Sequence, residues 1–194
     1  KNYQVKEPFF NRTKFILMGD SILKNNNYVK PEQCVEFLLN KKKKNNIIVA
    51  EDSSYIIDLN KQFDIIKNKI NTNTKIFISI GGNDILYDNL NEFINNNYKN
   101  NVVEIFKFFK KTIRRLFKDT KAKLYFFNIY YPKNEKYKKN YKNISEWNHL
   151  LKQFTQKYDY NLIEIDKIFR HKKDFTNEIE PSYQGSKLLV NKII

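Results

Sequence analysis

The sequence predicts an α/β domain with a parallel sheet that is covered by helices on both faces. Five short apolar runs alternate with longer stretches in which apolar residues recur every three or four positions. Parallel strands are joined by helical crossovers and are buried on both faces, so this alternation favours a parallel sheet. No linker rich in Pro, Gly or Ser divides the chain, and we therefore expect residues 1–194 to form a single domain.

The expected strands are short runs of branched and aromatic residues. They cover residues 14–18 (KFILM), 46–50 (NIIVA), 75–80 (KIFISI), 123–128 (KLYFFN) and 161–166 (NLIEID). The first four runs are almost continuously apolar, which is typical of strands that are covered on both faces.

The expected helices show apolar residues on one face. They cover residues 56–70, 102–116 and 147–154, and a last helix covers residues 185–194. Polar runs at residues 25–27, 41–44, 95–97 and 133–143 are interpreted as solvated loops or helix ends. The last of these runs is basic and follows the fourth expected strand, so we expect it to make the rim of a pocket at that edge electropositive.

Composition excludes several classes of protein. Hydrophobic residues make up 41% and aromatic residues 15% of the 194 residues, which is too apolar for a disordered chain. The single cysteine, Cys34, excludes an intramolecular disulfide, and no apolar run approaches the roughly 18 residues that a membrane span needs. The chain begins at Lys1 without a signal-like segment, so we expect a fragment of a soluble protein whose compartment the sequence does not indicate.

The formal charge of +15 comes almost entirely from lysine, because only four residues are arginine. Arginine is the preferred side chain for bidentate phosphate contacts, so the composition argues against a nucleic-acid partner. Lys, Asn, Ile, Phe and Tyr all have A/T-rich codons, and a low-GC genome therefore accounts for much of the lysine. A face that binds polyanions is the alternative explanation.

Polar residues follow two of the predicted strands, at the edge where parallel sheets carry their chemistry. Gly19-Asp20-Ser21 follows the first run, and Gly81-Gly82-Asn83-Asp84 follows the third. A serine directly after a Gly-Asp turn can be held at the strand end as a nucleophile needs. The amide of Asn83 is the kind of N–H donor that holds a tetrahedral oxyanion.

At these positions the sequence resembles the SGNH/GDSL hydrolase family. Residues 18–21 (MGDS) resemble the first block, with Ser21 at the nucleophile position, and residues 80–84 (IGGND) resemble the third, with Asn83 at the oxyanion position. Residues 177–185 (NEIEPSYQG) resemble the last block. The resemblance implies a three-layer α/β/α sandwich with the flavodoxin-like strand order 2-1-3-4-5, and hydrolysis of ester bonds.

The second block departs from the family pattern. The family places a glycine after the second strand, and the backbone N–H of that glycine helps to bind the oxyanion. Residues 50–54 read AEDSS and contain no glycine. By resemblance, the oxyanion and substrate-binding residues are Asp52, through the backbone, together with Gly82 and Asn83.

The last block departs further, because Glu180 stands at the histidine position and Asn177 at the aspartate position. The net charge of the pair remains −1, whereas Glu beside Asp would bring two carboxylates together and raise one pKa. The resemblance thus implies Ser21, Glu180 and Asn177 as catalytic residues, with Asp174 as a further candidate orienter. The histidines, His149 and His171, are expected on a helix and in a loop.

The combined prediction is a serine esterase that hydrolyses small acyl esters through an acyl-enzyme, with O-acetyl groups on carbohydrate as one candidate substrate. The alternative is a catalytically impaired module on the same fold that binds a glycan or a protein partner. The third hypothesis is a lysine-rich protein that binds nucleic acid. We expect no cofactor and no metal, because Asp20, Asp84 and Glu180 lack any His or Cys at metal-ligand spacing.

Overall fold

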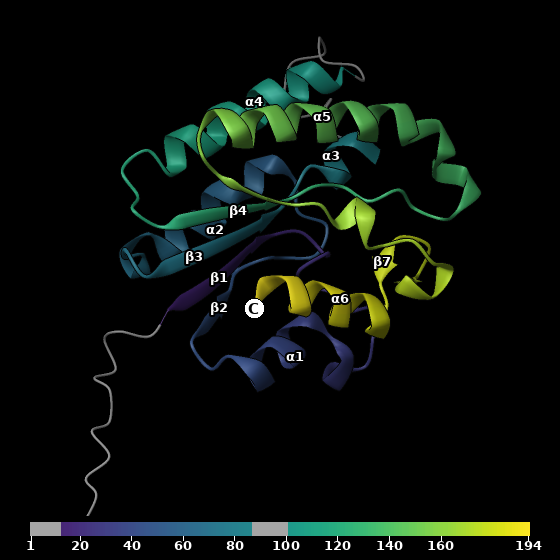
Figure 1. Ribbon diagram of the computed structural model, residues 1–194, viewed down its shortest axis with the longest axis horizontal. Helices are drawn as coiled ribbons and strands as arrows, with labels where there is room; N and C mark the ends of the chain where they lie inside the picture. Colours follow the sequence, from purple (N-terminus) through teal and green to yellow (C-terminus); the bar gives the residue numbers. More distant parts are fainter. Residues whose placement is uncertain (1–12, 87–100) are drawn as a thin grey trace, which may run out of the picture.

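The computed structural model describes residues 13–86 and 101–194, and its centre is a five-stranded parallel sheet (Figure 1). The strand order β2-β1-β3-β4-β5 confirms the predicted order 2-1-3-4-5. The strands are β1 (Lys14–Gly19), β2 (Asn46–Ile48), β3 (Thr74–Ser79), β4 (Lys123–Phe127) and β5 (Asn161–Ile163). Because all five run the same way, their carboxyl ends lie at one edge of the sheet.

Helices cover both faces of this sheet, as the sequence predicts (Figure 1). The α-helices are α1 (Val35–Lys42), α2 (Leu59–Ile66), α3 (Gly82–Leu86), α4 (Val102–Leu116), α5 (Tyr141–Lys157) and α6 (Tyr183–Ile193). Short 3-10 helices are η2 (Pro31–Gln33), η3 (Ile56–Asp58), η4 (Lys67–Lys69), η6 (Glu135–Asn140), η7 (Ile165–Lys167) and η8 (Lys172–Asp174). None of the described helices is long and apolar enough to cross a membrane.

Alternate residues of the central strands enter two separate apolar clusters. Ile16 and Met18 of β1 point into the cluster beneath α2, α4 and α5, whereas Phe15 and Leu17 point into the cluster beneath α1 and α6. Side chains on a strand alternate between the two faces, so a continuous apolar run fills both clusters at once.

Two of the differences from the sequence-based expectation concern β5 and α1. The run at residues 161–166 forms a strand only as far as Ile163, and the chain then turns into η7. Helix α1 was not predicted, because its buried residues Val35 and Leu39 are followed at once by the lysine run that reads as a polar patch.

Two of the polar runs are less solvated than the sequence suggests, whereas the run at residues 41–44 is exposed at the end of α1, as expected. Asn25 is fully buried, although it begins an asparagine run that we expected in a loop. The run at residues 133–143 forms η6 and the start of α5, with Tyr137 and Asn140 buried. The run at residues 95–97 lies outside the described residues.

Candidate active site

The end of β1 requires a glycine. Gly19 has a φ of +119°, and a Cβ at this position would lie 1.7 Å from the carbonyl oxygen of Ser79 on β3. The backbone N–H of Asp20 then donates to that carbonyl at 3.0 Å. The close approach of the two strands thus sets the turn that carries Ser21.

The end of β3 also requires a glycine. Gly81 has a φ of +102°, and a Cβ there would lie 2.3 Å from the indole of Trp147 on α5. The chain turns directly into α3, which places Asn83 in its first turn. The Nδ2 of Asn83 donates to the carbonyl oxygen of Ser54 at 2.8 Å. A primary amide has two N–H donors, so the second remains for a substrate oxygen.

A cavity of about 40 Å³ lies at this edge and brings together four of the residues singled out in the sequence: Ser21, Gly82, Asn83 and Glu180. Its volume corresponds to roughly three water-sized groups. Most of the remaining wall is apolar and comes from the segments that follow β1, β3, β4 and β5 and from the turn at residues 177–179: Ile22, Ile80, Leu86, Ile129, Tyr130, Pro132, Ile165 and Ile179.

Glu180 reaches the cavity from a short antiparallel hairpin that the sequence did not predict. The hairpin joins β6 (Phe175–Thr176) and β7 (Glu180–Pro181). Its position is fixed by Asn25, whose Nδ2 donates to the carbonyl oxygen of Pro181 at 2.9 Å. Only 7% of Glu180 is exposed, and its Oε2 has no hydrogen-bond partner among the described residues.

Burial raises the pKa of Glu180 to about 7. Loss of solvent is the largest cause, the favourable interaction of the carboxylate with the Ser21 hydroxyl opposes it, and the negative charge of Asp52 adds to it. The carboxyl group facing the serine therefore changes its charge near neutral pH.

Two further carboxyl groups are buried at the same edge. Burial raises the pKa of Asp20 to about 8, against hydrogen bonds from Ser79 Oγ at 3.0 Å and Ile22 N at 3.2 Å. Burial likewise raises the pKa of Asp84 to about 7, although both of its oxygens accept from the N–H of Ile56. The negative charges of Glu180 and Asp84 also raise the pKa of Asp20. At neutral pH Asp20 is therefore mainly protonated.

Several solved structures share the fold of this chain. No protein-family model matches the chain, and no curated protein matches it. Among solved structures, a lipolytic G-D-S-L family protein from Veillonella parvula is 18% identical with a TM-score of 0.68, over 92% of this chain and 94% of that one. The acetyl xylan esterase AlAXEase is 14% identical with a TM-score of 0.73, over 92% and 96%. A GDSL-like lipase from Bacteroides thetaiotaomicron is 13% identical with a TM-score of 0.67, over 96% and 88%.

The chain has the SGNH/GDSL hydrolase fold. At identities this low the likeness extends to the fold alone, and the chemistry depends on the side chains that this chain carries. In this fold Ser21 follows β1, Asn83 follows β3 and Glu180 begins β7, and all three lie at the carboxyl edge of the sheet. The fold therefore explains why these three residues line one cavity.

Two candidate partners of Glu180, Asp174 and Asn177, lie in other environments. The carboxylate of Asp174 accepts the backbone N–H groups of Arg170 at 3.0 Å and His171 at 2.8 Å, which closes the turn at η8. Asn177 is exposed in the β6–β7 turn with a φ of +44°. The described hydrogen bonds link neither side chain to Glu180. Sequence reasoning placed both beside the base, but the two-residue strands turn Asn177 outward.

The segment that follows β2 contains a left-handed residue that is not a glycine. Ser53 has a φ of +59°, a conformation that favours glycine. Asp52 does not line the cavity, and its carboxylate accepts from Tyr28 Oη at 2.9 Å and Asn27 Nδ2 at 3.0 Å. Asp52 therefore acts on the site through its charge, which raises the pKa of Glu180.

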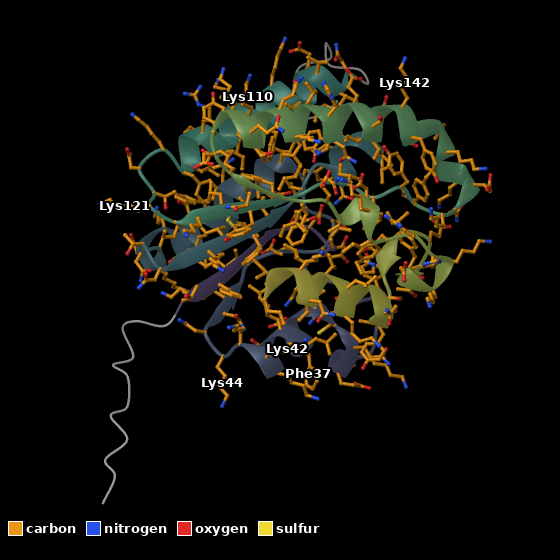
Figure 2. All side chains as sticks on the ribbon, in the orientation of Figure 1. Phe37, Lys42, Lys44, Lys110, Lys121 and Lys142 are labelled. Atoms are coloured by element: carbon orange, nitrogen blue, oxygen red, sulfur yellow. The ribbon has the colours of Figure 1, made fainter. Side chains whose placement is uncertain are left out.

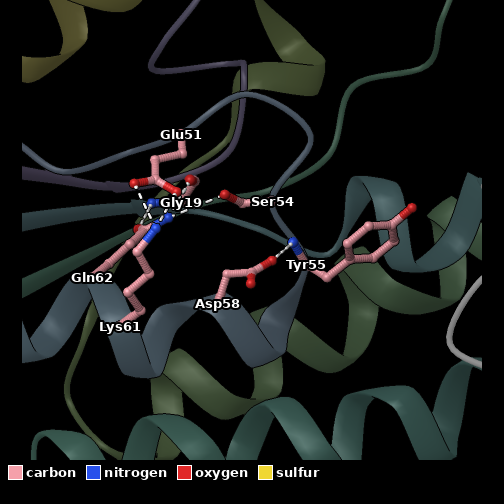
Figure 3. A network of polar contacts seen from close by, with 7 residues as sticks. All are labelled: Gly19, Glu51, Ser54, Tyr55, Asp58, Lys61 and Gln62. Atoms are coloured by element: carbon pink, nitrogen blue, oxygen red, sulfur yellow. Dashed lines mark hydrogen bonds and ion pairs between the residues drawn. The ribbon is translucent and has the colours of Figure 1, made fainter. Parts of the chain in front are cut away.

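Gln62 of α2 is a residue of this site that the sequence analysis missed (Figure 3). Its Oε1 accepts the N–H of Gly19 at 2.7 Å, and its Nε2 donates to the carbonyl of Gly19 at 2.9 Å and to Ser54 Oγ at 3.2 Å. Gln62 is fully buried. The sequence could have indicated this role, because Gln62 lies between Leu59 and Ile66 on the apolar face of a helix. A polar side chain buried at such a position needs hydrogen-bond partners.

The remaining polar candidates lie at the rim or outside the site. His149 is exposed on α5 beside Gln153, and His171 is exposed at the start of η8, as expected for both. The basic run adjoins the cavity through Pro132, but Lys136 pairs with Glu178 and Lys138 with Glu135. The rim is therefore less positive than the sequence alone suggests. Within residues 13–86 and 101–194, no group of three His, Cys, Asp or Glu side chains is placed to hold a metal.

Proposed function

We propose that this protein is a serine esterase in which Ser21 is the nucleophile and Glu180 is the general base. The observation that carries the proposal is the buried carboxyl of Glu180, which lines the same cavity as Ser21 and has a pKa raised to about 7. A general base works best when its pKa lies near the working pH, and burial brings this glutamate there from its usual value of about 4.3.

The reaction follows from these positions. The Oγ of Ser21 attacks the carbonyl carbon of the ester while its proton passes to the carboxylate of Glu180. The negative charge that develops on the carbonyl oxygen is held by the free amide proton of Asn83 and by backbone N–H groups of the Ser21 and Gly82 turns. The tetrahedral intermediate then collapses, the alcohol leaves with the proton from Glu180, and an acyl group remains on Ser21.

Water completes the cycle. Glu180, again a carboxylate, removes a proton from a water molecule that attacks the acyl carbon, and the acid leaves as Ser21 regains its proton. Asp20 is mainly protonated at neutral pH, so Glu180 carries the negative charge that the reaction uses.

The cavity supports a small acyl group. Its volume of about 40 Å³ and its apolar wall suit an acetyl group better than a long acyl chain. Two of the structures with this fold are named as an acetyl xylan esterase and a GDSL-like lipase. We extend the proposal to small acyl esters, with O-acetyl groups on carbohydrate as the substrate to test first.

One observation favours a second candidate, a catalytically impaired module that binds a glycan or a protein. Glu180 Oε2 has no described hydrogen-bond partner, so the carboxyl lacks the third group that normally orients a catalytic base. Such a module would keep the cavity and hydrolyse no ester.

Ester turnover separates the two candidates. Wild-type protein is assayed with p-nitrophenyl acetate and p-nitrophenyl hexanoate, and Ser21→Ala gives the background from surface lysines. The esterase predicts acetate turnover well above that background and a strong preference for acetate over hexanoate. Turnover equal to the Ser21→Ala background on both esters, and on acetylated xylan, would favour the binding module.

A further inference from the structure

The two edges of the parallel sheet carry opposite charge. The amino edge consists of the residues that precede and begin each strand, namely 13–15, 43–47, 67–75, 117–124 and 158–162. These segments contain two aspartates, Asp119 and Asp159, and nine lysines. The amino-edge lysines are Lys14, Lys43, Lys44, Lys67, Lys69, Lys75, Lys118, Lys121 and Lys123.

The carboxyl edge has the reverse balance. The segments that follow the strands, together with the β6–β7 hairpin, are residues 20–24, 49–55, 80–86, 128–136, 164–167 and 174–181. They hold four lysines and ten carboxyl side chains: Asp20, Glu51, Asp52, Asp84, Glu135, Glu164, Asp166, Asp174, Glu178 and Glu180. A low-GC coding bias would load lysine onto both edges alike, so this segregation needs another cause.

The amino-edge lysines are available to a partner. Within the described residues Lys67 pairs with Asp64, whereas the other eight take part in none of the ion pairs. Lys75 and Lys123 stand directly opposite each other in the register of β3 and β4. Like charges on neighbouring strands repel, and an anion between them would remove that repulsion.

The lysines follow the order of the strands and therefore form a row. From one side to the other they precede or begin β2, β1, β3 and β4, as Lys44, Lys14, Lys75 and Lys123. Lys75 and Lys123 share one face of the sheet, whereas Lys14 pairs with Thr74 and its side chain leaves the strand on the other face. Neighbouring strands lie about 4.8 Å apart, so the row is roughly 15 Å long. Figure 2 shows Lys44 and Lys121 projecting from the side of the molecule where the strands begin.

We infer that the amino edge of the sheet binds a linear acidic polysaccharide. A row of single charges fits a chain with one carboxylate on each sugar, at a spacing close to that of the strands. The preference for a polysaccharide over other polyanions rests in part on the proposed function, because an esterase of acylated glycans would gain from holding such a chain.

Two features of the edge disfavour other polyanions. Single-stranded nucleic acids are bound through exposed aromatic rings. At this edge Phe15 and Tyr125 lie beneath Lys75, whose Nζ is 5.5 Å and 5.7 Å from the two ring centroids. The partly buried rings of Tyr158 and Tyr160 stack on each other, and Arg114 covers Tyr158 at 5.2 Å. A flat anionic membrane would suit a broad patch with exposed apolar anchors. None of the exposed large apolar side chains of the described residues belongs to the amino-edge segments.

The test measures binding in the Ser21→Ala background, so that turnover plays no part. Binding to polygalacturonate is compared with binding to neutral dextran, to a thymidine oligonucleotide and to vesicles that contain phosphatidylserine. The edge variant replaces Lys44, Lys121 and Lys123 with Gln, and the matched control replaces Lys139, Lys142 and Lys152 with Gln. All six lysines are exposed and take part in none of the described ion pairs, and both variants lose three charges.

The inference predicts salt-dependent binding to polygalacturonate, none to dextran, and roughly tenfold weaker binding by the edge variant but not by the control. Equal weakening by both variants would overturn it in favour of a net-charge effect. Absent binding, or tighter binding to the oligonucleotide or the vesicles, would also overturn it. Loss of esterase activity alone would contradict only the proposed function, because binding is measured in a protein that lacks Ser21.

Discussion

Gln62 holds both backbone polar groups of Gly19, accepting its N–H at 2.7 Å and donating to its carbonyl at 2.9 Å. The same side chain donates to Ser54 Oγ, and the carbonyl of Ser54 accepts from Asn83. One glutamine on α2 thus connects the turn that carries the proposed nucleophile with the amide proposed to hold the oxyanion.

Replacing Gln62 with Leu should destabilise the protein. The variant leaves the N–H of Gly19 buried without a partner, which costs about 1–3 kcal/mol, whereas the carbonyl of Gly19 keeps the N–H of Glu51 at 3.0 Å. The free energy of unfolding, measured by denaturant titration, should fall by roughly 1–3 kcal/mol. Gln153→Leu on exposed α5 is the control, and an equal effect of both variants would refute the special position of Gln62.

Gly19→Ala should be one of the most damaging single substitutions in the chain. Its Cβ would lie 1.7 Å from a backbone oxygen of β3, at a φ of +119° that alanine rarely adopts. Gly82→Ala is the matched control, because its nearest neighbour, Asp20 Oδ2, would be 3.9 Å away. Thermal unfolding should show a large loss of Tm for Gly19→Ala and little change for Gly82→Ala. Similar Tm values for the two variants would contradict the close approach of β1 and β3.

Stability should fall as the pH rises through neutrality. Asp20, Asp84 and Glu180 have raised pKa values of about 8, 7 and 7, so the folded state binds protons more tightly than the unfolded state. Their contribution to stability is complete below the ordinary carboxyl pKa of about 4 and is lost as the pH passes through 7 to 8.

Thermal unfolding at a series of pH values measures this effect. Asp84→Asn keeps an acceptor for the N–H of Ile56 and cannot ionise, so its Tm should exceed that of the wild type at alkaline pH. Asp64→Asn, at an exposed position, is the control. A wild-type Tm that stays level or rises between mildly acidic and alkaline pH would disagree with the raised pKa values.

The sheet was predictable because its strands are buried on both faces. Runs such as KFILM and KIFISI contribute side chains to both apolar clusters, and a glycine lies at or just after the end of β1 and of β3. Ser21 and Asn83 were predictable for the same reason, since each lies within three residues of such a glycine.

The environment of Glu180 could not be predicted from the sequence. The β6–β7 hairpin has only two residues in each strand, too few for a periodic pattern, and it turns Asn177 into solvent. Asn25, which fixes the hairpin, lies in an asparagine run that resembles low-complexity sequence. Hydrophobic periodicity does not indicate which distant residues a single polar side chain will bond, so these contacts could not be predicted.

Asn83→Ala should lower kcat with little change in KM. Loss of one oxyanion donor typically reduces kcat by about 10²–10³-fold, because that hydrogen bond strengthens only as the charge develops. Steady-state kinetics with p-nitrophenyl acetate provides the measurement, with Asn60→Ala on the exposed surface of α2 as control. A rise in KM at constant kcat would instead show that Asn83 binds the ground state of the substrate.

The pH dependence of kcat/KM for p-nitrophenyl acetate tests the central claim most directly, with wild type, Glu180→Gln and Ser21→Ala compared at each pH. If the carboxylate of Glu180 is the base, the wild-type rate rises through an apparent pKa of about 7 and then levels. Glu180→Gln should lose this rise and approach the Ser21→Ala background. A Glu180→Gln protein that keeps the wild-type rate and profile would contradict the account and leave Glu180 without a catalytic role.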